Sequence, residues 1–262
     1  MSAIVKTEAV VLKSMKYGES SKIVTFYTRR FGKLSAIARG ARRSASKYGS
    51  ALEPMSHNSI VVYKKEERTL QTLSQCDAIN SFRHLCEDIQ KMSIGISIIE
   101  LITRIAHEEE ENAPLFALLV DALDTLDSAT KNLQNVFYSF DIRFLKISGF
   151  QPSFGECAGC SAPLAGDNFV GEEVQFHIGK GGPLCRSCAG ITGRKIALPR
   201  KALEALEVLS ASRSLRASLD IDMDKRLRKD IETFLASYLR YHVSGMSDLK
   251  SEKVFSKILI LM

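Results

Sequence analysis

Four of the six cysteines in this 262-residue chain form two Cys-x-x-Cys pairs. Cys157 and Cys160 make the first pair, and Cys185 and Cys188 follow after 24 intervening residues. Two residues between cysteines let both sulfurs reach one ion from a tight turn, and four thiolates satisfy tetrahedral Zn²⁺ with no open position. Such closed sites usually hold together a segment that cannot build its own core, so we predict a structural Zn²⁺. His177, between the pairs, is an alternative fourth ligand.

The same residues raise the possibility of an enzyme, because residues 107–109 read His-Glu-Glu and formally match the His-x-Glu of zinc deaminases. That signature requires Pro directly before the second cysteine pair, whereas here Leu184 separates Pro183 from Cys185. Four cysteines would also leave no position for a catalytic water. The sequence has no Walker phosphate loop and no recognisable catalytic carboxylate spacing. We therefore predict no catalytic residues, with an unrecognised nuclease as a remaining alternative.

A second chemical feature is an acid-free window between Glu19 and Glu53 that contains eight cations. Residues 1–80 carry 14 Lys and Arg against 6 Asp and Glu, whereas residues 81–262 carry 22 against 24. A concentrated positive patch attracts polyanions by Coulomb force and by release of their condensed counterions. The first cation is Lys22, and the seven that we predict to bind nucleic acid are Arg29, Arg30, Lys33, Arg39, Arg42, Arg43 and Lys47. The alternative is a solvated charged face.

Four aromatic residues in or beside this window present two alternatives. Tyr17, Tyr27, Phe31 and Tyr48 either offer surfaces on which bases stack or belong to the core, and core packing is the commoner use.

The hydrophobic pattern predicts which elements position these residues. Residues 1–80 contain five stretches typical of short strands, at 4–12, 23–28, 34–38, 59–63 and 69–76. Five strands in about 80 residues favour a small barrel or sandwich, and the five-stranded Greek-key barrel of the OB type is the natural candidate. Beyond residue 80 the spacing becomes helical, at 89–106, 115–126, 133–145 and 226–242.

We therefore expect an α+β chain of several domains. The predicted parts are an OB-type barrel at 1–80, a helical domain at 81–150 and 199–262, and a four-cysteine zinc-binding insert at 151–198. Gly149 should end the helix before the insert, and residues 169–178 could form a hairpin arm between the cysteine pairs.

Composition points to a soluble protein, with 45% hydrophobic and 25% charged residues. The most apolar stretch, 92–99, is far shorter than the roughly 20 residues of a membrane span, and the start shows no secretory signal. We expect a cytoplasmic protein without a membrane partner. In that reducing setting the cysteine pairs favour metal over disulfides.

An ordered set of short motifs resembles RecO, the bacterial recombination mediator family. The motifs are Val10-Val-Leu-Lys13, Tyr17-Gly-Glu-Ser20, Phe31-Gly-Lys33, Ala38-Arg-Gly-Ala-Arg-Arg43, Phe150-Gln-Pro152, both cysteine pairs, Leu239-Arg-Tyr-His242 and Leu249-Lys-Ser251. They follow the family order over nearly the whole chain.

The resemblance implies an OB domain, a helical domain with a zinc-binding insert, and a role in recombinational DNA repair. Members bind single- and double-stranded DNA, anneal complementary strands, and work with RecR to place RecA on strands coated by single-strand-binding protein (SSB). Some bind the carboxy-terminal tail of SSB on the helical domain. The cytoplasmic protein would then join the nucleoid during repair.

The second hypothesis is a protein-interaction adaptor of the repair or transcription machinery, held together by zinc and with incidental DNA contact. The apolar run at 254–262 is then a docking strand, although such runs more often pack on their own core.

Overall fold

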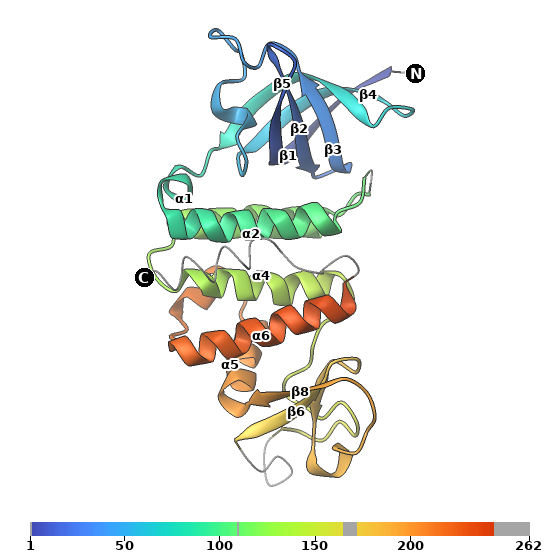
Figure 1. The fold of residues 1–262 in the computed structure, drawn as a ribbon, viewed down its shortest axis with the longest axis vertical. Helices are drawn as coiled ribbons and strands as arrows, with labels where there is room; N and C mark the ends of the chain where they lie inside the picture. Colours follow the sequence, from blue (N-terminus) through green and yellow to red (C-terminus); the bar gives the residue numbers. More distant parts are fainter. Residues whose placement is uncertain (1, 109, 165–171, 244–262) are drawn as a thin grey trace. The chain divides into compact units, whose positions relative to one another are not determined.

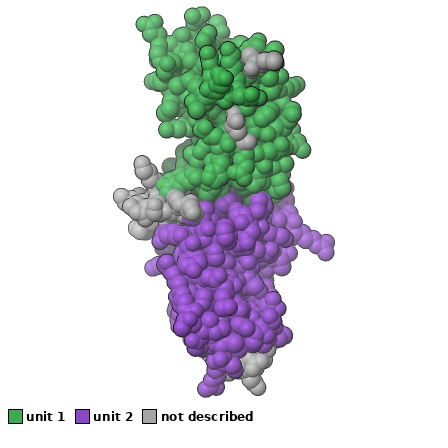
Figure 2. Space-filling model, turned by 90° about the vertical axis from the view of Figure 1, so that its right-hand side faces the viewer, with its two compact units in different colours: residues 1–128, 248–262 green, residues 129–247 purple. Residues whose placement is uncertain are grey.

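The computed structural model describes residues 2–108, 110–164 and 172–243. They divide into two compact units, coloured separately in Figure 2, with the boundary between Ser128 and Ala129. The finer division predicted at residues 80, 150 and 198 stays a prediction. The segments 249–251 and 254–262, named above as a motif and a docking strand, lie outside the described residues.

Five strands at the start of the chain close into a barrel in the order β1-β2-β3-β5-β4 (Figure 1). Their bounds are Ser2–Tyr17 for β1, Ser21–Thr28 for β2, Gly32–Ala38 for β3, His57–Lys65 for β4 and Leu70–Asn80 for β5. All neighbours pair antiparallel except β3 and β5, which are parallel, and the long strand β1 closes the ring by pairing with both β2 and β4. The predicted OB-type barrel is confirmed.

The barrel closes around alternating apolar side chains. Along β3 every second residue is buried, so Leu34 and Ala36 point inward with Val24 and Phe26 of β2. The 3-10 helix η1, Gly49–Leu52, adds Leu52 to this core. The inside of the barrel is therefore filled, and ligands meet only its outer surface.

Three helices follow the barrel in the described part of the first unit: α1 is Arg83–Glu87, α2 is Ile89–Ile105 and α3 is Ala113–Ser128. The Asp88 side chain accepts hydrogen bonds from two backbone N–H groups at the start of α2, which caps that helix. The linker between α2 and α3 is tied to the barrel, because the Lys33 backbone N–H donates to the His107 carbonyl oxygen at 3.1 Å. The β2–β3 turn is thus held against the helical part of its own unit.

The second unit combines helices with a small sheet (Figure 1). Its helices are α4, Leu133–Ile147, α5, Arg200–Ala211, and α6, Lys225–His242, with the 3-10 helix η3 at Arg216–Asp220. Strands β6, Glu173–His177, β7, Gly182–Leu184, and β8, Lys195–Pro199, form an antiparallel sheet in the order β7-β6-β8. The four predicted helical stretches are confirmed as α2, α3, α4 and α6.

Two details bear on the predictions. Gly149 has φ of +81° just after α4, so it ends this helix as expected. The predicted arm at 169–178 includes β6, whereas residues 165–171 lie outside the described part. Within the described part, no helix combines the length and apolarity that crossing a membrane requires.

Candidate metal centre and nucleic-acid interface

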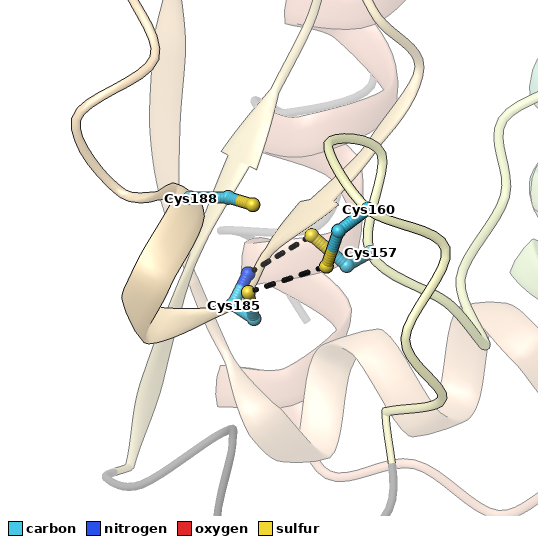
Figure 3. A group of neighbouring side chains, drawn as sticks. All are labelled: Cys157, Cys160, Cys185 and Cys188. Carbon is cyan, nitrogen blue, oxygen red and sulfur yellow. Dashed lines mark hydrogen bonds between the residues drawn. The ribbon is translucent and has the colours of Figure 1, made fainter.

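The two cysteine pairs meet in the second unit. Cys157 and Cys160 lie in the loop after α4. Cys185 lies between β7 and the 3-10 helix η2, Arg186–Cys188, and Cys188 is the last residue of that helix. Their four sulfur atoms lie within 4.8 Å of one another, and Figure 3 shows them converging. Four thiols from two turns around one point are the donor set of a tetrahedral structural metal site.

Backbone amides around the cluster prepare it for negative charge. The N–H groups of Gly159 and Cys185 each donate to Cys157 Sγ at 3.3 Å. Burial opposes ionisation of the Cys157 thiol, but these amides and that of Cys160 outweigh it and lower its pKa to about 6. Hydrogen bonding with the Cys185 thiol helps to raise the pKa of Cys188 to about 12. A cation would allow all four thiols to ionise together.

Close packing at Gly159 explains why the first knuckle requires a glycine. A Cβ placed on Gly159 would lie 2.8 Å from both Cys188 Sγ and Ile191 Cδ1. The two knuckles therefore approach each other through a surface without a side chain, and any substitution pushes them apart.

His177 does not belong to the cluster. Its Nε2 donates to the Thr192 carbonyl oxygen at 2.9 Å, and its Nδ1 accepts from the Lys180 backbone N–H at 3.1 Å. Both ring nitrogens are occupied by loops of the module, so the histidine alternative is wrong. Among the described residues the possible metal ligands grouped here are the four cysteines alone.

The cations predicted to bind nucleic acid separate into two groups at opposite ends of β3. One group, here called the base cluster, contains Arg29, Arg30 and Lys33 at the β2–β3 turn. The other, here called the rim cluster, contains Arg39, Arg42, Arg43 and Lys47 in the loop after β3. Lys33 and Arg39 are the members nearest in sequence, and the six residue steps between them span about 20 Å along an extended strand.

The base cluster has acidic neighbours that the linear sequence hides. Arg29 pairs with Glu8 of β1 at 3.1 Å. Lys33 donates to the Thr103 carbonyl oxygen at 3.4 Å. It also lines a shallow cleft with acids from the β4–β5 turn and the α2–α3 linker, namely Glu66, Glu67 and Glu108. The positive potential at this end is therefore partly neutralised.

The rim cluster is exposed and keeps its charge. Each of its four side chains is exposed, and none forms an ion pair with a carboxylate among the described residues. The Arg42 guanidinium donates to the Gly18 carbonyl oxygen at 2.9 Å, and its backbone N–H donates to Ser20, which anchors the loop to the β1–β2 turn. Lys47 reaches the Ser74 carbonyl oxygen at 2.5 Å. Fixed in this way, the loop presents its cations at one end of the barrel.

Beside the rim lies an apolar outer face that the sequence analysis missed. The strand register aligns Met15 with Ile23, and Ile23 with Ile37, all pointing away from the core. Met15 is 44% exposed and Tyr17, two residues further along β1, is 50% exposed. The signal that could have revealed this face is the alternation of side chains along each strand. Because every second side chain faces the core, the side chains between them face outward, and here they form a surface against which bases can pack.

The four aromatic residues divide accordingly. Tyr27 and Tyr48 are buried, and Phe31 is partly buried against the barrel core. Burial raises the pKa of Tyr27 to about 12. Tyr17 alone of the four is exposed, so the core interpretation is confirmed for Tyr27 and Tyr48 and leaves Tyr17 at the outer face.

Comparison with known proteins agrees with this architecture. Residues 1–82 match the family model described as "Recombination protein O N terminal", and residues 86–253 match "Recombination protein O C terminal". A protein named DNA repair protein RecO from Salinibacter ruber is 32% identical over 98% of this chain and 95% of its own length. Those of the same name from Syntrophus aciditrophicus and Pelodictyon phaeoclathratiforme are each 31% identical, over 97% and 98% of this chain and 95% and 99% of their own lengths. The chain therefore belongs to the RecO family of DNA repair proteins.

Proposed function

We propose that this chain is a non-enzymatic DNA-binding mediator of recombinational repair, which binds single- and double-stranded DNA and anneals complementary strands. The observation that carries the proposal is the exposed rim cluster beside the outer face of an OB-type barrel in a RecO family member. The rim cations neutralise phosphates, and the outer face accepts bases.

Annealing needs no covalent step. Arginine pairs with phosphate through two parallel hydrogen bonds and also stacks on bases, so Arg42 and Arg43 suit a flexible single strand. The barrel neutralises part of the backbone charge and thereby lowers the repulsion between two strands. Salt-sensitive contacts with phosphates carry no sequence information, so a bound strand can slide until it is in register with its complement.

The base cluster remains part of the predicted DNA surface. Arg29, Arg30 and Lys33 would extend the path of a longer strand or a duplex along β3. Their acidic neighbours favour a weaker contribution than that of the rim cluster.

We propose further that the four cysteines hold a structural Zn²⁺. Cys157, Cys160, Cys185 and Cys188 would be its ligands, and the ion would supply the cross-link between the two knuckles. Such a site has no open position, so the metal stabilises the module and takes no part in DNA chemistry.

The proposed partners besides DNA are RecR and the carboxy-terminal tail of SSB, with RecA as the protein finally placed on the strand. These partners follow from the family, whose members here are named DNA repair proteins. Action on chromosomal DNA makes the protein cytoplasmic, with association to the nucleoid during repair, and gives it no membrane partner.

Strand annealing followed by fluorescence energy transfer between complementary labelled oligonucleotides tests the proposal. We expect the wild-type chain to accelerate annealing, and the rim variant Arg42→Glu/Arg43→Glu to lose at least tenfold in rate. The charge control Arg213→Glu/Arg226→Glu changes the net charge equally at two exposed positions of the second unit, and it should retain the wild-type rate.

The same experiment separates the mediator from the adaptor and from a nuclease. Wild-type protein that binds RecR or the SSB tail but does not anneal would favour the adaptor. Shortened oligonucleotides after long incubation with divalent metal would reveal a nuclease and contradict the non-enzymatic proposal.

A further inference from the structure

The second unit contains an acid-free window of its own. Between Glu173 and Glu204 the chain has no Asp or Glu, and six cations lie there: Lys180, Arg186, Arg194, Lys195, Arg200 and Lys201. The nearly balanced charge of residues 81–262 conceals this window, because the acids of that region lie elsewhere in the sequence. The window covers the second cysteine knuckle and all of β7 and β8.

The sheet register gathers three of these cations at one end. His177, the last residue of β6, faces Gly182 of β7 and Lys195 of β8. The Ile178 backbone N–H donates to the Arg194 carbonyl oxygen at 2.9 Å, so the β6–β7 turn with Lys180 lies beside Arg194. Lys180 and Arg194 are exposed, and neither forms an ion pair with a carboxylate in the described part of the chain.

Two exposed aromatic rings lie at the same end of the sheet. His242, at the end of α6, donates from Nε2 to the Ile178 carbonyl oxygen at 2.9 Å. The rings of Phe150 and Tyr241 lie against His242, with centroid separations of 5.1 and 4.9 Å. A Cβ on Gly179 would come within 2.8 Å of Tyr241 Oη, so the tyrosine lies directly on the β6–β7 turn.

These rings are held in place but remain accessible. Tyr241 is 48% exposed and Phe150 is 40% exposed. The backbone of Phe150 is fixed by donation from its N–H to the Leu145 carbonyl oxygen at 2.8 Å, in the turn that ends α4. Rings whose positions are set by their own unit lose little conformational entropy when a flat ligand stacks on them.

Exposed rings beside unpaired cations are the combination with which proteins bind single strands. The cations track the phosphates, and the rings stack on bases irrespective of sequence. A single exposed aromatic residue would be ordinary. Here two exposed rings lie beside Lys180 and Arg194, and both cations belong to the acid-free window. Charge complementarity therefore favours a polyanion that carries planar aromatic groups.

We propose that Phe150, Lys180, Arg194 and Tyr241, here called the sheet-end patch, bind a second single strand of DNA separately from the barrel. The inference rests on the proposed function for the choice of DNA as the polyanion. One chain would then hold two strands at once, one on each unit. This arrangement raises the effective concentration of one strand near the other, which annealing requires.

Native mass spectrometry with an eight-nucleotide oligo-dT tests the proposal, because it counts strands per full-length chain. We expect two strands on the wild type and on the charge control Arg213→Glu/Arg226→Glu. The patch variant Lys180→Glu/Arg194→Glu and the rim variant Arg42→Glu/Arg43→Glu should each bind one. The uncharged variant Tyr241→Ala should weaken the second strand about tenfold, as loss of one stacking surface does.

The outcomes distinguish this inference from the proposed function. If the patch variant still binds two strands, the sheet-end patch is overturned and the rim site is unaffected. The same conclusion follows if the wild type binds one strand and the rim variant binds none. Two strands on the rim variant together with one on the patch variant would support the patch and contradict the rim assignment. Zinc content and thermal unfolding equal to wild type confirm that each variant is folded.

Discussion

The Glu53 carboxylate pairs with Lys22 Nζ at 2.8 Å, so the acid that borders the acid-free window on one side folds back onto the first cation inside it. Lys22 is mostly covered, with 21% of its side chain exposed, whereas Glu53 is 59% exposed. The strand β2 and the loop after η1 are thereby joined near the rim cluster. The cations of the window that attract DNA most strongly are therefore those that form no ion pair with a carboxylate.

Releasing this pair should therefore strengthen DNA binding. Glu53→Gln frees Lys22 and removes one negative charge, and we expect the log–log salt dependence of oligo-dT binding to steepen by up to about 0.7. The free energy of unfolding should change by less than about 1 kcal/mol, because a pair whose carboxylate is exposed to water contributes little. Glu111→Gln, which removes an exposed acid of the same unit, is the control. Equal slopes for both variants would contradict the role given to Lys22.

A matched pair of glycines tests the attachment of the barrel to its helices. Gly18 and Gly32 both have φ of +56°, but a Cβ on Gly18 meets nothing within 4 Å, whereas one on Gly32 would overlap the Glu110 carbonyl oxygen. Gly18→Ala should cost about 1 kcal/mol from the backbone conformation alone. Gly32→Ala should cost at least about 3 kcal/mol, because overlap with the backbone is added. Denaturant-dependent hydrogen exchange in residues 21–38 measures the loss of stability in both variants. Equal losses of stability would show that the α2–α3 linker moves aside to accommodate the new methyl group.

The close approach of the two cysteine knuckles predicts a metal-affinity effect. Gly159→Ala should lower zinc affinity about 10- to 100-fold, because its Cβ displaces Cys188, and outer-shell changes of this kind have that effect. Gly190→Ala adds the same methyl group where nothing lies within 4 Å, so its affinity should equal wild type. Competition with a chromophoric chelator gives both values. Unchanged zinc affinity in Gly159→Ala would mean that metal binding does not depend on the close approach of the two cysteine knuckles.

Loss of a cysteine should destabilise the second unit. Cys185→Ser removes a buried thiol of the cluster, and we expect zinc content to fall from one ion per chain to nearly none, with early unfolding of residues 172–199. Cys86→Ser, at an exposed cysteine outside the cluster, should keep both zinc and stability. Metal analysis measures the zinc content, and limited proteolysis detects the early unfolding of residues 172–199. Affinity at the rim should persist in Cys185→Ser, because the barrel has its own core.

The barrel was predictable because alternation in residues 1–80 encodes which side chains turn inward, as Val24, Phe26 and Leu34 do. The cysteine cluster was predictable because its two spacings fix the geometry locally. The separation of the rim and base clusters was not predictable from charge alone. It depends on the course of β3 between them and on the β1–β2 register, which brings Glu8 to Arg29.

The sheet-end patch escaped the sequence analysis for a related reason. Its members come from the turn after α4, the β6–β7 turn, the residue before β8 and the end of α6, so no local window contains them all. Net charge summed over 182 residues also averaged out a strongly positive stretch. Contact between segments far apart in the chain is the information that a single sequence lacks.

Fluorescence-anisotropy titration of a labelled oligo-dT strand across a salt series tests the central claim most directly. The wild type, the rim variant Arg42→Glu/Arg43→Glu and the charge control Arg213→Glu/Arg226→Glu are compared. A single strand should give a slope of about −0.7 per phosphate neutralised, and loss of two arginines should flatten it by about 1.4. A flattened slope with weakened binding in the rim variant alone is the predicted result. A rim variant that binds with the same affinity and slope as the wild type would contradict DNA binding at the barrel rim.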